Sequence, residues 1–333
     1  MGLGRIGRNL FRLLYRDPSL ELAVISDVAD LEALVYLLKW DTLLGRFPEP
    51  LEVRDGVLRV AGREVRMLQA EKPGEASWGD LGIEIVVEAT AQNRDRAELE
   101  KHLAAGARRV LLCSPPKDPP DRTVVMGVND GELRAEDRIV SNASSTAHAA
   151  APVLQILERE FGIERAFLST VHAYSNQQRL ADVPAEDKRR GRAAAENIIP
   201  QETNAGEVIV ELLPGLRGRL TAAAVNVPIA NGSAVDLVCW HSRPVSIEAI
   251  NAAVRAVAQE RLRGILGYEE DPIVSSDVLH TPESGTFDAQ ATMTIGDRVS
   301  KTLTWFDNGW GYAHRAVELL RRMAAFGAAG GGR

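Results

Sequence analysis

Apolar residues recur at helical spacing close to the start of the chain. Ile6, Leu10 and Leu14 follow one another at intervals of four residues, and arginines fill the other side of the same segment. The spacing places the apolar side chains on one face, so it predicts an amphipathic helix over residues 5–16. Residues 95–105 repeat the pattern and predict a second helix.

Short runs rich in β-branched and other apolar residues alternate with these helices through the first third of the chain. They predict strands at 20–26, 83–89, 109–113, 124–128 and 138–143. Strands that alternate with helices are typical of a mainly parallel sheet whose crossovers are helical. The first part of the chain is therefore predicted to be an α/β domain.

The pattern changes near Ser144, and the strands that follow have mostly antiparallel character. A long amphipathic helix is predicted over residues 150–160. The strands are predicted at 165–174, 220–227, 234–241, 289–295 and 299–306, with a tight turn at 295–297. This arrangement predicts an α+β domain. The chain closes with a predicted helix over 313–325 and an unstructured tail over 328–333.

The composition is that of a folded protein with about two domains, because the 333 residues are 45% hydrophobic and 26% charged. The net charge is −7 with both signs interspersed, so we expect no nucleic-acid partner. No apolar run is long enough for a membrane span or a signal peptide, so we expect a cytoplasmic protein without a membrane partner. The two cysteines lie far apart, which argues against a disulfide framework and a zinc site, and we expect no bound metal.

A glycine-rich motif opens the first predicted helix. It has the form Gly-x-Gly-x-x-Gly, whose bare amides can receive a pyrophosphate, and it includes Gly2, Gly4, Arg5, Ile6 and Gly7. Asp27 follows the last glycine by 20 positions, where a carboxylate can accept both ribose hydroxyls of an adenosine. The carboxylate of Asp27 would repel the 2′-phosphate of NADP, so the glycine-rich motif and Asp27 together favour NAD over NADP. The alternative interpretation is that the glycines only begin a helix and that Asp27 only caps a strand.

A buried strand normally precedes this motif, but here the motif begins at residue 2. Either the sheet lacks its central first strand, or the true start lies upstream. Loss of a central strand would expose the apolar faces of both its neighbours, so we expect an upstream start.

Further motifs follow in order along the whole chain. They are YLLKWD at 36–41, GRF at 45–47, VMGVN at 125–129, SNAS at 141–144, TVHAY at 170–174, NIIP at 197–200 and WFDNGWGY at 305–312. In order and spacing they resemble the phosphorylating glyceraldehyde-3-phosphate dehydrogenase family. The resemblance implies an oxidoreductase that acts on an aldehyde with NAD and assembles as a homotetramer. It implies a Rossmann-type NAD-binding domain over 1–144 plus 309–333, and an α+β catalytic domain with an antiparallel sheet over 145–308.

The resemblance also implies roles at the reacting centre. In the family, a cysteine thiolate activated by a histidine attacks the aldehyde, and the cysteine lies in the motif Ser-Cys-Thr-Thr-Asn. Here Ser144, Ser145 and Thr146 occupy the first three positions of that motif, and His172 matches the base. The nucleophile is therefore Ser145. A serine hydroxyl has no accessible anion near neutral pH, so the histidine cannot form the nucleophile in advance as it does for a thiol.

Cofactor and substrate positions follow from the same resemblance. Cys113 matches a position beside the cofactor, and Asn308 matches the residue that holds the nicotinamide carboxamide. The substrate and phosphate positions are Ser144, Thr146, Ser175, Arg190, Thr203 and Asn226. Asn226 replaces a phosphate-binding arginine, and an amide cannot supply the charge of a guanidinium. The sequence thus predicts weakened binding of a phosphorylated aldehyde.

Three functions are compatible with these residues. The first is an NAD-dependent aldehyde oxidoreductase with altered or weak activity, in which His172 takes a proton from a hydrated aldehyde and no covalent intermediate forms. The second is a non-catalytic NAD-binding paralogue with a regulatory or assembly role. The third is a serine hydrolase that uses Ser145 and His172, although no nucleophile elbow or oriented carboxylate accompanies them.

Overall fold

The computed structural model describes residues 1–176 and 178–330. These residues form two compact units. The first unit holds Met1–Val124, Asn129–Ala143 and the chain from Ala313 onward, and the second holds Val125–Val128 and Ser144–Tyr312. In the part of the chain that is described, no helix is long and apolar enough to cross a membrane.

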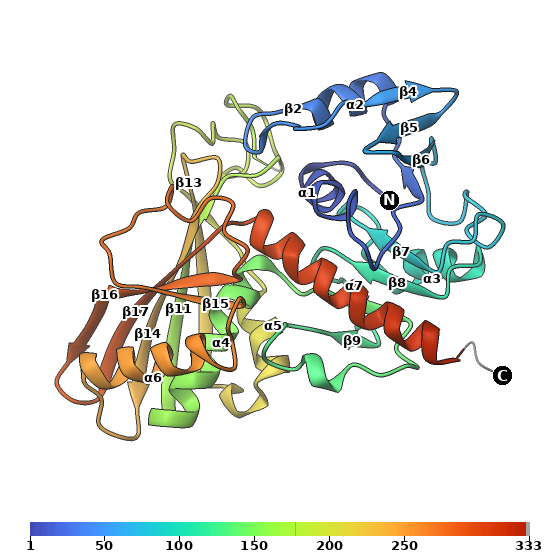
Figure 1. Ribbon diagram of the computed structural model, residues 1–333. Helices are drawn as coiled ribbons and strands as arrows, with labels where there is room; N and C mark the ends of the chain where they lie inside the picture. The colour runs from blue at the N-terminus through green and yellow to red at the C-terminus, as the bar shows by residue number, and fades with distance from the viewer. Residues whose placement is uncertain (177, 331–333) are drawn as a thin grey trace. The chain divides into compact units, whose positions relative to one another are not determined.

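The first unit is an α/β arrangement, as the sequence predicts (Figure 1). Its helices are α1 (Arg5–Leu14), α2 (Leu31–Lys39), α3 (Arg96–Ala104) and most of α7 (Trp310–Gly330). Its strands are β1 (Val24–Ser26), β2 (Trp40–Asp41), β3 (Gly45–Arg46), β4 (Glu52–Arg54), β5 (Val57–Val60), β6 (Arg63–Leu68), β7 (Ile85–Glu88), β8 (Arg109–Leu112), β9 (Arg122–Thr123) and β10 (Ile139–Ser141).

Two sheets of four strands carry the first unit. One has the order β1-β6-β5-β4, in which β1 and β6 are parallel and the other pairs antiparallel. The other has the order β7-β8-β10-β9, and all of its pairs are parallel. Met1 and Gly2 bond to the last residues of both β7 and β1, so they place the glycine-rich motif at the carboxyl ends of two parallel strands.

The second unit is built on one sheet with the order β12-β13-β11-β14-β17-β16-β15. Its strands are β11 (Ile163–Ala173), β12 (Ile199–Gln201), β13 (Leu220–Val227), β14 (Ser233–His241), β15 (Leu266–Glu269), β16 (Gly285–Ile295) and β17 (Val299–Phe306). Its helices α4 (Ser145–Phe161), α5 (Ala205–Leu212) and α6 (Ile247–Gln259) pack against this sheet, and Figure 1 shows α4 and α6 lying along it. The α+β prediction is confirmed, but β11 pairs with β13, and β15 with β16, in parallel.

Several predicted elements are confirmed in detail. Strands β13 and β17 have the predicted bounds, and the turn before β17 has Gly296 at a φ of +58°. Helix α4 begins at Ser145, five residues before the predicted start at 150, because the Ser144 hydroxyl accepts a hydrogen bond from the Ala147 amide and caps it.

Two predictions of local structure are wrong. The strand predicted at 124–128 is instead the short β9, and a turn follows it because Gly127 adopts a φ of +81°. The tail predicted to be unstructured is helical over 328–330, where α7 continues to Gly330 through alanines that favour a helix. Residues 331–333 of that predicted tail lie outside the described residues.

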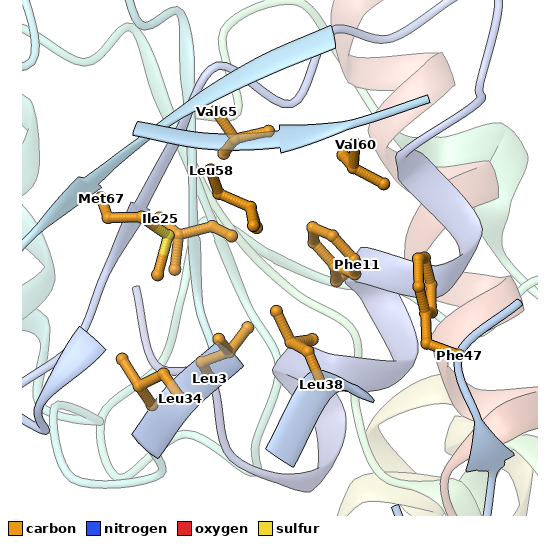
Figure 2. Close-up of a cluster of buried hydrophobic side chains, with 10 residues drawn as sticks. All are labelled: Leu3, Phe11, Ile25, Leu34, Leu38, Phe47, Leu58, Val60, Val65 and Met67. Atoms are coloured by element: carbon orange, nitrogen blue, oxygen red, sulfur yellow. The ribbon is translucent and has the colours of Figure 1, made fainter. Parts of the chain in front are cut away.

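Ten buried apolar side chains from α1, α2, the first sheet and the loops beside them meet in one cluster (Figure 2). Leu38 and Leu58 have no exposed surface, and the rings of Phe11 and Phe47 have centroids 5.5 Å apart. Figure 2 shows Phe11 of α1 pointing toward the strand residue Leu58. This core therefore holds α1, and with it the glycine-rich motif, against the sheet.

The substitution Leu58→Ala tests this core. It removes apolar atoms and leaves a cavity, so we expect the free energy of unfolding to fall by about 2–5 kcal/mol. Urea denaturation followed by fluorescence measures the change. Leu180→Ala is the matched control, since Leu180 is 83% exposed. Equal stability of the two variants would contradict the assignment of this cluster as the core of the first unit.

Candidate functional site

The glycine-rich motif of the first unit is shaped by close backbone contacts. Gly2 has a φ of +89°, and a Cβ on it would lie 2.9 Å from backbone and side-chain atoms of Ala89 and Thr90. A Cβ on Gly7 would lie 2.1 Å from the carbonyl oxygen of Gly2, whereas one on Gly4 would point into open space. Gly2 and Gly7 are therefore required for packing, and Gly4 leaves the start of α1 accessible.

The amino end of α1 suits an anion. Gly4 is the N-cap, no side chain caps the helix there, and its first turn, which starts with Arg5 and Ile6, has no acidic residue. The first amides of a helix carry partial positive charge and lack partners within the helix. A pyrophosphate therefore fits this helix start, as the sequence predicts.

Asp27 lies directly after β1 and holds the glycine-rich loop. Its Oδ2 accepts a hydrogen bond from the Leu3 amide (2.6 Å), and its Oδ1 accepts one from the Ala29 amide (3.0 Å). Each carboxylate oxygen has a second lone pair, so the group retains acceptor capacity for ribose hydroxyls. The first backbone amides of α1 fit the pyrophosphate of a dinucleotide, and the carboxylate of Asp27 fits its ribose hydroxyls.

Neither thiol of the chain is a candidate nucleophile. Cys113 follows β8 in the first unit, and its burial raises the pKa of its thiol to about 12. Cys239 lies in β14 of the second unit, and burial also raises the pKa of its thiol. A thiolate is the reactive form of cysteine, so both side chains are inert near neutral pH.

Ser145 is the first residue of α4 in the second unit. Its neighbour Ser144 is the N-cap, and Thr146 is buried. His148, one turn further, is also buried, and its ring meets the edge of Tyr312 at a centroid distance of 6.0 Å. Ser145 therefore lies at the positive end of a helix, and His148 packs in the core of its unit.

His172 lies near the carboxyl end of β11, and its ring has a defined orientation. The distance from its Nδ1 to the carbonyl oxygen of Ala173 is 2.6 Å. A carbonyl oxygen only accepts, so Nδ1 carries the hydrogen in this bond and Nε2 is left as the basic nitrogen. The bond to the Ala173 carbonyl therefore favours the tautomer in which Nε2 is the proton acceptor.

Asn308 joins His172 to a serine that the sequence analysis missed. The amide of Ala173 donates to Ser233 Oγ (2.9 Å), and Ser233 Oγ donates to Asn308 Oδ1 (2.7 Å). Because Oδ1 accepts this bond, Asn308 directs its Nδ2 toward the ring of His172, at 3.2 Å from Nδ1 and 3.4 Å from Nε2. Ser233 is a buried polar residue at the start of β14, and other serines such as Ser141 and Ser300 are equally buried, so no feature of the sequence singles it out.

The residues predicted to bind phosphate lie in different surroundings. Asn226 of β13 is buried and is the register partner of His172 on β11, so both side chains lie on the same face of the sheet. Thr203 Oγ1 accepts a hydrogen bond from the Ala205 amide at the start of α5. Ser175 Oγ donates to the side chain of Gln178 (3.0 Å).

Arg190 lies in the segment between β11 and β12, where it is half exposed and pairs with Asp187 at 3.3 Å. An exposed pair of this kind contributes little to stability. Of the predicted substrate positions, Asn226 is therefore the one that the sheet register sets beside His172. Among residues 1–176 and 178–330, no three His, Cys, Asp or Glu side chains are arranged to hold a metal ion.

Comparisons with known proteins cover both units. The model of the glyceraldehyde 3-phosphate dehydrogenase NAD-binding domain matches residues 1–96, and that of the C-terminal domain matches residues 144–308. Glyceraldehyde-3-phosphate dehydrogenase of Geobacillus stearothermophilus is 41% identical over 327 residues, which is 98% of this chain and 97% of that protein. The one of Streptomyces coelicolor is 43% identical over 321 residues, 96% of this chain and 95% of that protein. These similarities support NAD as the cofactor.

The substitution Ser233→Ala tests the chain of hydrogen bonds behind His172. It leaves the buried Ala173 amide without its acceptor, so we expect the free energy of unfolding to fall by about 1–3 kcal/mol. It also frees Asn308 to rotate, so the ring nitrogen signals of His172 in an NMR spectrum are expected to shift and broaden. Ser233→Thr keeps a hydroxyl and is the control. An unchanged His172 spectrum in the alanine variant would show that Ser233 does not orient Asn308.

Proposed function

The chain belongs to the glyceraldehyde-3-phosphate dehydrogenase family, and from this premise we propose that it oxidises a hydrated aldehyde to the free acid with NAD. The proposal has one central observation. The chain offers an oriented imidazole, His172, but both of its thiols are buried with raised pKa values. Chemistry at this site therefore depends on proton transfer and not on a thiolate.

The hydroxyl of Ser145 is a poor substitute for the missing thiol. A serine hydroxyl becomes nucleophilic only when a base removes its proton during the attack. The base of a serine nucleophile is commonly supported by a carboxylate that stabilises the imidazolium, and His172 Nδ1 meets a backbone carbonyl there instead. An acyl ester on Ser145 would also be released to phosphate less readily than a thioester. We therefore assign no covalent intermediate to Ser145.

His172 Nε2 can act directly on the hydrated aldehyde. It accepts the proton of one hydroxyl while the carbon–oxygen double bond of the acid forms, and the hydrogen on that carbon leaves as hydride. When bound, NAD supplies the acceptor for this hydride. The products are the free acid, NADH and a proton, so no phosphate is consumed. Proton transfer by a positioned side chain commonly accelerates a reaction by about 10²–10⁴-fold.

The substrate is proposed to be a small aldehyde without a phosphate group. Asn226 lies beside His172 in the register of the sheet, and an amide there provides hydrogen bonds but no positive charge. A phosphorylated aldehyde would lose the charge-assisted contact that an arginine makes at this position in the family. Ser144, Thr146, Ser175, Arg190 and Thr203 remain candidates for substrate contacts.

The residues proposed to bind the cofactor are those that the resemblance to the family assigns. The first amides of α1 would hold the pyrophosphate, Asp27 would accept the ribose hydroxyls, and Asn308 would donate Nδ2 to the nicotinamide carboxamide. In this proposal the NAD-binding domain comprises residues 1–144 with 309–333, and the catalytic domain residues 145–308.

The outer face of the large sheet supports a proposed homotetramer. Phe167 and Trp240 are each 43% exposed, and Ile295 is 77% exposed. Their register relations place all three on one face of β11, β14 and β16, and α4, α5 and α6 pack against the sheet. Large apolar side chains gathered on one face favour contact with a second copy. Light scattering checks this, and a stable monomer at micromolar concentration would contradict it.

Turnover can be tested with NAD and a panel of phosphorylated and unphosphorylated aldehydes by following NADH absorbance. We expect activity that does not depend on phosphate, with free acid as product.

His172→Asn is expected to lower the rate by about 10²-fold or more, because it removes the proton acceptor. Ser145→Ala is the matched variant, and it is expected to keep most of the activity. Loss of activity in Ser145→Ala, or a strict need for phosphate, would contradict the mechanism. Binding of NAD without turnover on any aldehyde would contradict an enzymatic role.

A further inference from the structure

Two ionisable side chains of the first unit are completely buried and take no part in the proposed chemistry. Glu88 is the last residue of β7, His102 lies in α3, and neither retains exposed surface. Both elements belong to the first unit (Figure 1). Burial of a carboxylate is costly unless hydrogen bonds or a counter-charge compensate for it. The partners of these two side chains therefore indicate what they hold in place.

Trp78 sets the direction of the hydrogen bonds. Its indole Nε1 lies 3.0 Å from His102 Nδ1, and an indole N–H can only donate. Nδ1 therefore carries no hydrogen, so the ring is neutral and its hydrogen is on Nε2. That nitrogen donates to Glu88 Oε2, which lies 3.2 Å away. Trp78 is itself fixed, because its ring is buried in a cluster with Val86 and Ala107.

Four donors meet at the Glu88 carboxylate. Oε2 accepts from His102 and from Asn93 Nδ2, at 3.2 Å each. Oε1 accepts from the Thr90 amide at 2.9 Å and also from the Thr90 hydroxyl. Burial alone would raise the pKa of this carboxyl, but the bond from His102, the charge of the Met1 amine and the bonds from Thr90 together lower it. Glu88 is therefore an ionised acceptor near neutral pH.

Thr90 connects Glu88 to the glycine-rich motif. The Thr90 amide nitrogen and Cγ2 lie 2.9 Å from the position that a Cβ on Gly2 would take, so Thr90 packs against the first glycine of the motif. The Thr90 hydroxyl donates to Glu88 and accepts from the Gln92 amide (3.1 Å), so this side chain is held from both sides. The position of Glu88 thus fixes the surface against which the start of the nucleotide loop packs.

We propose that Trp78, His102 and Glu88 form a buried triad that positions the nucleotide loop for NAD. The three are positioning residues, because they are enclosed in the protein and act on the loop through Thr90. The inference deepens the proposed function, since it rests on the binding of NAD at the glycine-rich motif. A loop that is fixed before binding loses fewer conformations when the dinucleotide binds. We therefore expect the triad to set the affinity for NAD.

Two substitutions of His102 separate its two hydrogen bonds. In His102→Gln the side-chain amide reaches as far as Nε2 did and can still donate to Glu88. In His102→Asn the shorter side chain can still accept from Trp78 but no longer reaches Glu88. We expect calorimetry to show NAD binding that is about tenfold weaker in His102→Asn and within about twofold of the unmodified chain in His102→Gln.

Leu99→Ala is the matched control for a loss of stability. Leu99 is buried in the same helix, α3, but it packs in a different cluster with Val110 and Leu112. The substitution is expected to lower the thermal midpoint and to leave NAD affinity within about twofold. Equal weakening of NAD binding in Leu99→Ala and His102→Asn, or in the two variants of His102, would reveal a merely structural role and would overturn the proposal.

Glu88→Gln tests the direction of the hydrogen bonds. A carboxamide has one oxygen in place of two, so its N–H groups must face either the Thr90 amide or His102 Nε2, and both of these donate. In the first case, hydrogen exchange of the Thr90 amide becomes faster. In the second, the hydrogen of His102 moves to Nδ1, opposite the Trp78 indole, and the indole signal shifts in an NMR spectrum. Trp78→Phe identifies that signal. Absence of both changes would overturn the triad.

The outcomes separate this proposal from the proposed function. Absence of NAD binding in the unmodified chain would contradict both. NAD binding that does not respond to His102→Asn would overturn only the triad, and NAD binding without turnover on any aldehyde would contradict only the enzymatic role. The exchange of the Thr90 amide and the Trp78 signal need no bound cofactor.

Discussion

The hydrogen bond from His172 Nδ1 to the Ala173 carbonyl is the interaction on which the chemistry depends. It fixes which ring nitrogen carries the hydrogen, and so leaves Nε2 as the base. The Ala173 amide extends the same arrangement, because Ser233 and Asn308 follow from it in a chain of hydrogen bonds. The carbonyl of Ala173 thus contacts the imidazole directly, and the amide of the same residue is linked to it through Ser233 and Asn308. The proposed role of His172 in proton transfer rests on this orientation and on the burial of both thiols.

The first unit depends on a different constraint, namely the backbone contacts that hold its glycine-rich loop. Its glycine-rich motif begins at Gly2, and Met1 and Gly2 bond to β7 and β1 respectively, so backbone hydrogen bonds hold the start of this loop. Gly2 and Gly7 allow the loop to pack tightly, and Asp27 holds it through the Leu3 amide. In the proposed function, the first unit contributes the residues that bind the cofactor and the second contributes those that act on the aldehyde.

Much of this could be predicted from the sequence, because local patterns encode local structure. The spacing from Gly7 to Asp27 predicted a nucleotide loop, within which the Leu3 amide bonds to Asp27, and the β-rich runs predicted the bounds of β13 and β17. Ser233 could not be found in this way, since its role depends on a contact with Asn308, 75 residues away. The parallel pairing of β11 with β13 is likewise set by the topology of the whole sheet. The prediction of a strand at 124–128 was wrong, because Gly127 adopts a positive φ that ends the extended conformation despite the apolar residues around it.

The central claim is that His172 transfers a proton while Ser145 forms no bond to the substrate. Intact-protein mass spectrometry after rapid acid quench, during turnover with NAD and an aldehyde, tests it most directly. The account predicts an unmodified protein mass at every time point while the free acid accumulates. A transient increase equal to the acyl group, located on the peptide that contains Ser145, would contradict it.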